Sequence, residues 1–112
     1  MEGIVTEKIE SILGIDKFIQ ENKLAFLYIS SNNCTVCEAL MPKVQEVLEK
    51  YPRIISKKVV IDEIQEVSGH LSIFTIPVII FYIEGKEIFR RGRFISIDEI
   101  KDLIERYYKL ID

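Results

Sequence analysis

The residues of this sequence best suited to chemistry are its two cysteines, Cys34 and Cys37, which enclose Thr35 and Val36. At the start of a helix this spacing places the two thiols one turn apart, close enough to form a disulfide while the first stays exposed. Unpaired backbone N–H groups at a helix start also favour a thiolate at Cys34. The pair therefore predicts reversible thiol–disulfide chemistry, in which Cys34 attacks and Cys37 resolves the mixed disulfide.

Two other roles remain open for the pair at this point. Buried cysteines are common, so both thiols could be small core residues. A structural zinc site requires four ligands, and the chain has only two cysteines and one histidine, His70, so zinc binding would need a second chain. The order of a strand, a polar turn, the pair and a helix favours redox chemistry over metal binding. We therefore expect no metal, and for His70 a surface position without a catalytic role.

Two strand-and-helix units are predicted to hold the pair in place. Residues 24–29 are almost wholly apolar and of strand length, as in a central strand covered on both faces. Residues 30–33 form a polar turn, and apolar residues then recur at helical spacing over 37–51. A second, β-branched strand is predicted over 54–61, followed by a short polar helix or irregular crossover over 62–71. Two consecutive units of this kind favour parallel strands.

The second half of the chain predicts an antiparallel hairpin and a closing helix. The runs 78–83 and 86–90 flank a turn that contains Gly85. Ser96 and Glu99 have the spacing of a capping box ahead of an amphipathic helix. The predicted fold class is therefore three-layer α/β, with a central mixed β-sheet flanked by helices.

The first part of the chain is ambiguous. Apolar residues within 4–13 fit helical spacing, yet the run is also β-branched, so both a helix and a strand are compatible with it. Asp16 is then predicted to cap a short helix that closes at Asn22.

Length and composition limit the class of protein. A chain of 112 residues with 48% apolar and 29% charged residues fits one packed domain, which we expect to span residues 1–112. The net charge of −3 provides no broad cationic surface for nucleic acid or anionic lipid. The amino end lacks the features of a secretory signal, and no apolar run has the length of a spanning helix. We therefore expect a cytoplasmic, monomeric protein with neither nucleic acid nor membrane as a partner.

From Asp16 onward the sequence resembles the thioredoxin family. The resemblance rests on the cysteine pair together with residues at the family's separations: Pro42, Lys58, Asp62, Pro77, Gly85 and Gly92. It implies the thioredoxin fold and the activity of a thiol–disulfide oxidoreductase that reduces protein disulfides. It also implies disulfide-containing proteins as partners and no bound cofactor. Electrons would come from NADPH through a flavin-dependent, thioredoxin-reductase-like donor.

The resemblance also implies a substrate-binding surface beside the cysteines. Ile76 and Pro77 match the family's cis-proline position, so we expect a cis bond between them beside Cys34. Gly92 matches the glycine of the last strand, in a loop that would lie near the pair. The resemblance therefore implies that Ile76, Pro77 and Gly92 bind substrate.

Three arginines surround Gly92, and two readings of them stay open. Arg90, Arg91 and Arg93 are compatible with an ordinary solvated strand. If the loop lies near the cysteines, they would instead present cations to acidic partners.

Four positions depart from the family pattern. Asn33 stands where an aromatic residue usually precedes the first cysteine, and Thr35 and Val36 replace the usual Gly-Pro. Tyr28 occupies the place of a buried acid that handles the proton of the second cysteine, while the matching lysine, Lys58, is present. We therefore expect Tyr28 and Lys58 to take part in an altered proton path.

A different class of function is also compatible with the sequence. A thioredoxin-fold binding, adaptor or redox-sensing module would capture extended segments at Ile76 and Pro77 without turning over a disulfide. A turnover assay with a disulfide substrate separates this module from the enzyme.

Overall fold

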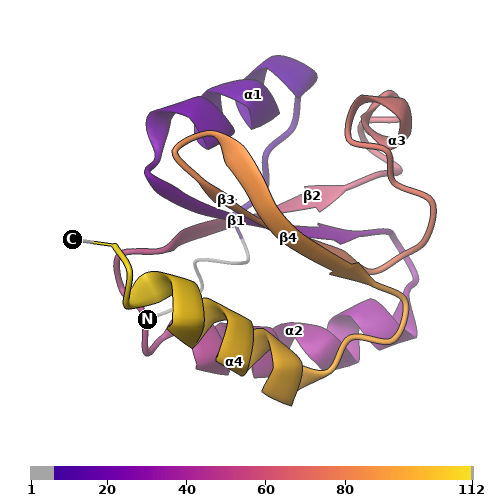
Figure 1. Ribbon diagram of the computed structural model, residues 1–112. Coiled ribbons are helices and arrows are strands. Elements are labelled where there is room, and N and C mark those ends of the chain that lie inside the picture. The colour runs from indigo at the N-terminus through magenta and orange to yellow at the C-terminus, as the bar shows by residue number, and fades with distance from the viewer. Residues whose placement is uncertain (1–6, 112) are drawn as a thin grey trace.

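A mixed four-stranded sheet lies between two pairs of helices (Figure 1). The structure is a computed structural model, and it describes residues 7–111. The strand order is β2-β1-β3-β4, with helices α1 and α3 over one face of the sheet and α2 and α4 over the other. The predicted three-layer α/β class with a mixed central sheet is confirmed.

The central strand β1 (Leu24–Ser30) is buried along its whole length. It pairs in parallel with β2 (Ile55–Val60) and antiparallel with β3 (Val78–Ile83). Its continuous apolar sequence follows from this position, because helices cover both faces and alternate side chains enter two different cores.

Strands β3 and β4 (Lys86–Gly92) form the predicted hairpin. Glu84 and Gly85 at its turn have φ values of 52° and 83°, the left-handed pair that a tight two-residue hairpin requires. A β-bulge between Phe81 and Tyr82 shifts the register of the pairing. The bulge interrupts the alternation of β4, because the successive side chains of Ile88 and Phe89 both pack against the core beneath α2 and α4.

Two long helices cover the face of the sheet that carries Tyr28. Helix α2 (Thr35–Leu48) begins directly after the first cysteine, and α4 (Ile97–Tyr108) closes the fold. The Ser96 hydroxyl accepts a hydrogen bond of 3.2 Å from the Glu99 amide, as the capping box predicts. The crossover between β2 and β3 contains one short helix, α3 (Val67–His70).

Helix α1 (Ile12–Glu21) begins earlier than the sequence predicts. The expected cap at Asp16 is wrong, because the Ser11 hydroxyl caps the helix by accepting a bond of 2.9 Å from the Gly14 amide. Extending the helix by one turn buries Ile15 against the sheet, which explains why the earlier start is favoured. The predicted end at Asn22 is confirmed.

The ambiguous first segment adds one bridge to the sheet. Lys8 forms an isolated parallel bridge with Lys58 on β2, and the Ile9 side chain is buried. The Ile9 amide donates to the Lys58 carbonyl at 2.9 Å, and the Lys58 amide donates to the Glu7 carbonyl at 2.8 Å. Residues 4–6 of the ambiguous run lie outside the described residues.

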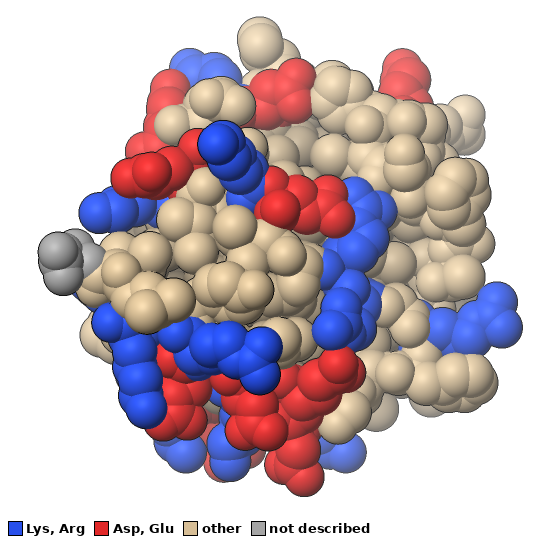
Figure 2. Space-filling view, in the orientation of Figure 1, with Lys and Arg blue, Asp and Glu red and all other residues tan. Residues whose placement is uncertain are grey.

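Charged side chains of both signs are interspersed over much of the surface that Figure 2 shows. The exception is the side that carries α3 in Figure 1, at the right of both views, where most of the surface is uncharged. Within residues 7–111, no helix is long and apolar enough to cross a membrane.

Candidate redox site

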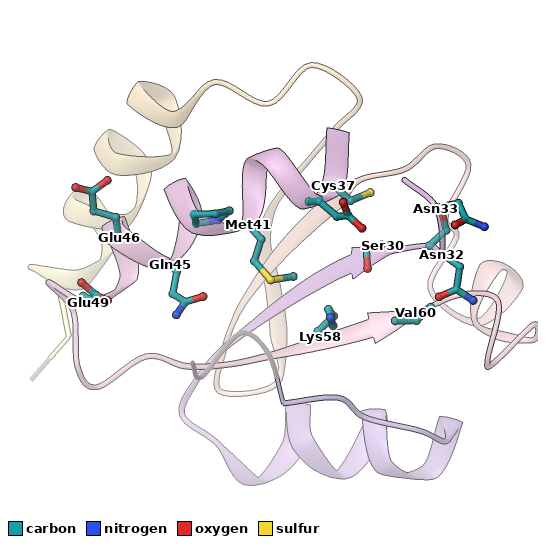
Figure 3. A pocket seen from close by; sticks show the side chains of 13 residues that line it. Ser30, Asn32, Asn33, Cys37, Met41, Gln45, Glu46, Glu49, Lys58 and Val60 are labelled. Carbon is teal, nitrogen blue, oxygen red and sulfur yellow. The ribbon is translucent and has the colours of Figure 1, made fainter. Parts of the chain in front are cut away.

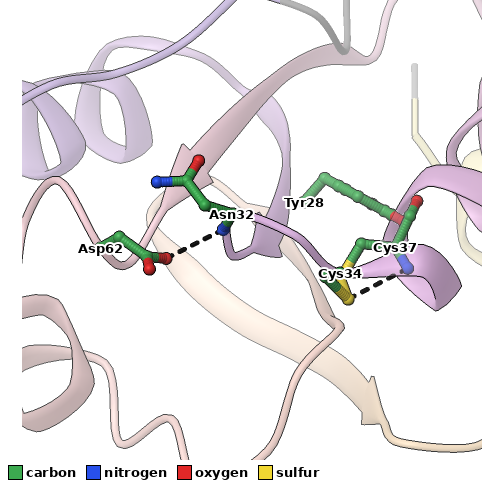
Figure 4. The surroundings of a disulfide bond; sticks show 5 residues. All are labelled: Tyr28, Asn32, Cys34, Cys37 and Asp62. Carbon is green, nitrogen blue, oxygen red and sulfur yellow. Dashed lines mark hydrogen bonds between the residues drawn. A yellow bond between two sulfur atoms is a disulfide. The ribbon is translucent and has the colours of Figure 1, made fainter.

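Cys34 and Cys37 form a disulfide at the start of α2, with Cα atoms 5.2 Å apart (Figure 4). Cys34 is the N-cap residue, in extended conformation, and its sulfur accepts a hydrogen bond of 3.2 Å from the Cys37 amide. That amide is one of the N–H groups that a helix leaves unpaired at its start. After reduction the same N–H and the helix dipole would favour negative charge on the Cys34 sulfur.

The two sulfurs differ in their access to solvent. Cys37 is only 2% exposed, whereas Cys34 is half-buried and Val36 between them is 60% exposed. A large molecule can therefore reach Cys34 before it reaches Cys37.

The turn between β1 and the disulfide is fixed by one acidic side chain. Asn32 donates its backbone N–H to the Asp62 carboxylate at 3.0 Å (Figure 4). Asn33 then adopts a left-handed φ of 58°, a conformation that asparagine tolerates better than most residues. Asp62, which the resemblance singles out, thus positions the turn that delivers Cys34.

Tyr28 lies beneath the pair on β1 and is fully buried. Its hydroxyl donates a hydrogen bond of 2.6 Å to the backbone carbonyl oxygen of Cys37. Desolvation by burial raises the pKa of Tyr28 well above its ordinary value, so the hydroxyl keeps its proton and remains a donor. The expected hydrogen bond at the second cysteine is therefore present, but it reaches the main chain.

Lys58 is the register partner of Tyr28 on β2, so both side chains project from the same face of the sheet. It lines a hollow of about 630 Å³ between α2 and β2, together with Cys37 and Met41. Figure 3 shows the Met41 side chain reaching from α2 across this hollow toward β2. Among residues 7–111, no carboxylate forms an ion pair with Lys58. The hollow therefore places a partly buried cation on the inner side of the second cysteine.

The structure brings the predicted substrate-binding residues together. The Ile76–Pro77 bond is cis, as expected, and Pro77 directly precedes β3. The Arg93 amide donates to the Pro77 carbonyl at 3.1 Å, which joins the Gly92 loop to the proline. Because Val78 pairs with Ile29, the proline lies at the carboxyl end of β1, the same end that leads into the cysteine turn.

Two exposed aromatic residues at this end were missed from the sequence. Phe74 and Phe94 are each 89% exposed, and they flank the cis-proline segment and the Gly92 loop respectively. The signal that could have identified them is their apolar character inside two loops, outside any helical or strand periodicity.

His70 lies on the surface beside helix α1. The His70 imidazole lies 2.8 Å from the Asp16 carboxylate on α1, and both side chains are partly exposed. Within the part of the chain that the structure describes, no cluster of three or more His, Cys, Asp or Glu side chains could hold a metal ion.

Comparison with known proteins identifies the family. The sequence matches the Thioredoxin family over residues 13–106. Thioredoxin-like protein YdfQ of Bacillus subtilis is 36% identical over 104 residues, which cover 93% of each chain. Thioredoxin of Mycoplasmoides gallisepticum is 31% identical over 101 residues, covering 90% of this chain and 97% of that protein. A structure of Plasmodium falciparum thioredoxin superposes with a TM-score of 0.81 at 24% identity, covering 91% of this chain and 99% of that one.

The chain belongs to the thioredoxin family, and its cysteine pair lies at disulfide distance, which supports thiol–disulfide oxidoreductase activity. Thioredoxins need no bound cofactor, since the redox-active group is the disulfide itself. As a class they act on disulfide substrates and are reset by reductases.

Proposed function

We propose that this chain is a protein-disulfide reductase that works through Cys34 and Cys37. The observation that carries the proposal is the asymmetry of the pair: the half-buried Cys34 sulfur accepts the Cys37 amide at the helix start, while the Cys37 side chain is 2% exposed. The more accessible, anion-stabilising position suits the attacking sulfur, and the inner position suits the resolving one.

The reaction begins with the reduced pair. The Cys34 thiolate attacks one sulfur of a substrate disulfide, which forms a mixed disulfide and releases the other substrate sulfur as a thiolate that takes a proton. Cys37 then loses its proton and attacks the Cys34 sulfur, and the second substrate thiolate leaves. Two electrons pass from the dithiol to the substrate, and the pair ends as the Cys34–Cys37 disulfide.

The Cys37 proton leaves in an unusual environment. Lys58 and Cys37 line the same hollow, so the Lys58 ammonium favours a thiolate at Cys37 through its charge, whereas Glu38, Glu46 and Glu49 in the same lining oppose it. Tyr28 supports the same turn by donating to the Cys37 carbonyl and remaining protonated. These two residues replace the carboxylate that the family pattern places beneath the pair.

Substrate segments bind where the half-buried Ile76 and the exposed Gly92 flank the buried Pro77. The hydrogen bond from Arg93 to the Pro77 carbonyl holds the two loops together. Phe74 and Phe94 add exposed apolar rings on either side, so apolar residues next to the substrate disulfide are preferred.

The remaining partners follow from the same reaction. A flavin-dependent, thioredoxin-reductase-like enzyme supplies electrons from NADPH, and no cofactor binds to the chain itself. The protein works as a monomer in the cytoplasm. That reducing compartment would keep the pair in its dithiol form between encounters with substrate.

Trapping of the mixed disulfide tests the proposal. Reduced Cys37→Ser protein, mixed with insulin as a disulfide-bonded probe, should accumulate a covalent complex through Cys34 because the resolving thiol is gone. The matched Cys34→Ser protein should trap nothing. Equal trapping by both variants would contradict the assignment of Cys34 as the attacking thiol and Cys37 as the resolving thiol.

A second outcome would favour the binding or redox-sensing module instead. In that case the parent protein would bind insulin without oxidising its own dithiol, and neither variant would form a covalent complex. A mass spectrum of the mixture without added reductant distinguishes the two functions.

A further inference from the structure

A single side chain joins β4 to the segment that precedes the cis-proline. The Arg90 guanidinium donates through Nη1 to the carbonyl oxygens of Leu71, at 2.9 Å, and Ser72, at 3.1 Å. Its Nε and Nη2 donate to the two carboxylate oxygens of Glu87, at 2.7 and 2.8 Å. One guanidinium thus forms a bidentate ion pair with Glu87 and hydrogen bonds to two main-chain carbonyls at once.

The carbonyls that Arg90 holds belong to a constrained turn. Ser72 has a φ of 57°, a left-handed conformation that is unfavourable for a residue with a side chain. Leu71 ends α3, where carbonyl groups lack helical partners, so a cation there is favourable. From Ser72 the chain runs through the exposed Phe74 and the half-buried Ile76 into Pro77.

We propose that Arg90 is a positioning residue for substrate capture: clamped by Glu87, it fixes the turn at Leu71 and Ser72 and thereby the placement of the Phe74–Pro77 segment beside the disulfide. This inference rests on the proposed function, in which that segment binds the substrate. Arg90 acts through the loop and touches neither cysteine in this scheme.

The Glu87 clamp explains why an arginine suits this position. A guanidinium offers five donors in a planar fork, so it can bind a carboxylate with one side and carbonyls with the other. The hydrogen bond from Arg90 holds the pKa of Glu87 below its usual range, and the same contact raises the pKa of Arg90. Both groups therefore stay charged near neutral pH, and the fork keeps its orientation.

The neighbouring residue provides an internal comparison. Arg91 lies on the opposite face of β4, where it forms an ion pair of 3.0 Å with Glu99 on α4. Its side chain is 37% exposed, against 32% for Arg90. Arg91 is thus an arginine of the same strand, similar burial and similar pairing, but it contacts α4 in place of the proline loop.

The test compares Arg90→Ala with Arg91→Ala in two reactions of the reduced protein. Oxidation by insulin requires the loop surface, whereas oxidation by bis(hydroxyethyl) disulfide, a small molecule without a peptide backbone, requires only the thiols. We expect Arg90→Ala to raise the half-saturating insulin concentration about tenfold, with the rate at saturating insulin and the small-disulfide rate nearly unchanged. Arg91→Ala should leave all three values close to those of the parent.

Two further variants separate positioning from simple loss of stability. Glu87→Gln releases the clamp without creating a cavity, and Arg90→Lys retains one cation near the carbonyls, so both should raise the half-saturating concentration by less than Arg90→Ala does. Equal effects of Arg90→Ala and Arg91→Ala on insulin would overturn the proposal. It would also fall if Arg90→Ala lowered only the melting temperature.

Failure of the proposed function has its own signature. If the parent protein does not oxidise with insulin at all, the reductase assignment falls whatever the variants do. Hydrogen exchange of the amides over residues 72–76 still reports whether Arg90 holds this turn in place. We expect the exchange to accelerate in Arg90→Ala but not in Arg91→Ala. Unchanged exchange in Arg90→Ala would show that Arg90 does not position this turn, whatever the turnover assay gives.

Discussion

The hydroxyl of Tyr28 donates a hydrogen bond of 2.6 Å to the main-chain carbonyl of Cys37. This contact ties the central strand to the first turn of α2, directly beneath the disulfide (Figure 4). It occupies the position at which the family resemblance leads one to expect an ionisable acid. A neutral donor there holds the helix in place but cannot accept the proton of Cys37.

Replacement of Tyr28 by an acid should therefore change the resolving step. We expect Tyr28→Asp to alter the pH dependence with which Cys37 resolves the mixed disulfide, while attack by Cys34 stays nearly the same. Both Tyr28→Asp and Tyr28→Asn lose a buried ring, at a cost of about 3–5 kcal/mol of stability. Because only the aspartate titrates, Tyr28→Asn is the matched control.

Rapid mixing across a range of pH measures the two steps separately in all three proteins. The proposed proton path would be refuted by superimposable resolution profiles for the aspartate and asparagine variants. In that event Tyr28 serves packing and helix attachment alone.

Stability should fall in alkaline solution because two buried tyrosines resist ionisation. Burial raises the pKa of Tyr82 to about 12 and that of Tyr28 in the same direction. In the unfolded chain both tyrosines ionise near a pH of about 10. Their contribution to the free energy of unfolding is therefore complete below that pH and is lost as the pH rises toward the folded-state pKa. Each unit of difference corresponds to about 1.4 kcal/mol.

Urea unfolding at several alkaline pH values checks this expectation. Tyr82→Phe should flatten the decline between a pH of about 10 and about 12, since it removes one of the two groups. A decline as steep in Tyr82→Phe as in the parent would contradict the assignment to that residue.

The exposed phenylalanines should contribute to substrate capture and little to folding. Phe74→Ser and Phe94→Ser remove rings that are each 89% exposed, so we expect changes in unfolding free energy within about 0.5 kcal/mol. Oxidation by subsaturating insulin should slow several-fold, and oxidation by bis(hydroxyethyl) disulfide should not. Leu110→Ser, which removes a 74% exposed side chain just after α4, is the control. A similar slowing in Leu110→Ser would remove any special role of the two rings.

Gly92 should tolerate no added methyl group without displacement of its neighbours. A Cβ there would lie 3.0 Å from the Thr75 hydroxyl oxygen and 3.1 Å from a Val78 methyl carbon. We expect Gly92→Ala to push the two loops apart, lower stability by about 1 kcal/mol and weaken insulin capture.

Gly69 provides the matched glycine substitution, because an added Cβ there meets nothing within 4 Å. Gly69→Ala should leave capture unchanged and stabilise the fold by about 0.4–1 kcal/mol through the unfolded chain. Thermal unfolding and insulin oxidation of both variants decide the matter. Equal behaviour of the two variants would show that crowding at Gly92 is irrelevant.

The sequence was sufficient to predict the layout around the disulfide. The uninterrupted apolar run of β1 requires coverage on both faces, and the spacing of Cys34 and Cys37 requires a helix start, so both features follow from local patterns. The capping box at Ser96 was equally predictable, because its donor and acceptor are close neighbours along the chain.

Other features depend on contacts between distant segments. Ser11 was preferred over Asp16 as the cap of α1 because an earlier start buries Ile15, and the sheet that receives Ile15 is not visible in the local pattern. The contact of Arg90 with Leu71 and Ser72 joins residues 18 and 19 positions apart. A run of arginines beside a glycine reveals neither the face on which each lies nor the carbonyls it reaches.

The short bridge between Lys8 and Lys58 has a consequence for how this chain meets other chains. An outer strand with unpaired N–H and C=O groups is a template on which any extended peptide can add itself. The Glu7 carbonyl and the Ile9 amide already bond the outward-facing N–H and C=O groups of Lys58. They therefore prevent another strand from pairing with the middle of β2. Removal of the leading segment through Ile9 would leave that edge open, and the chain would become prone to assemble edge to edge at high concentration.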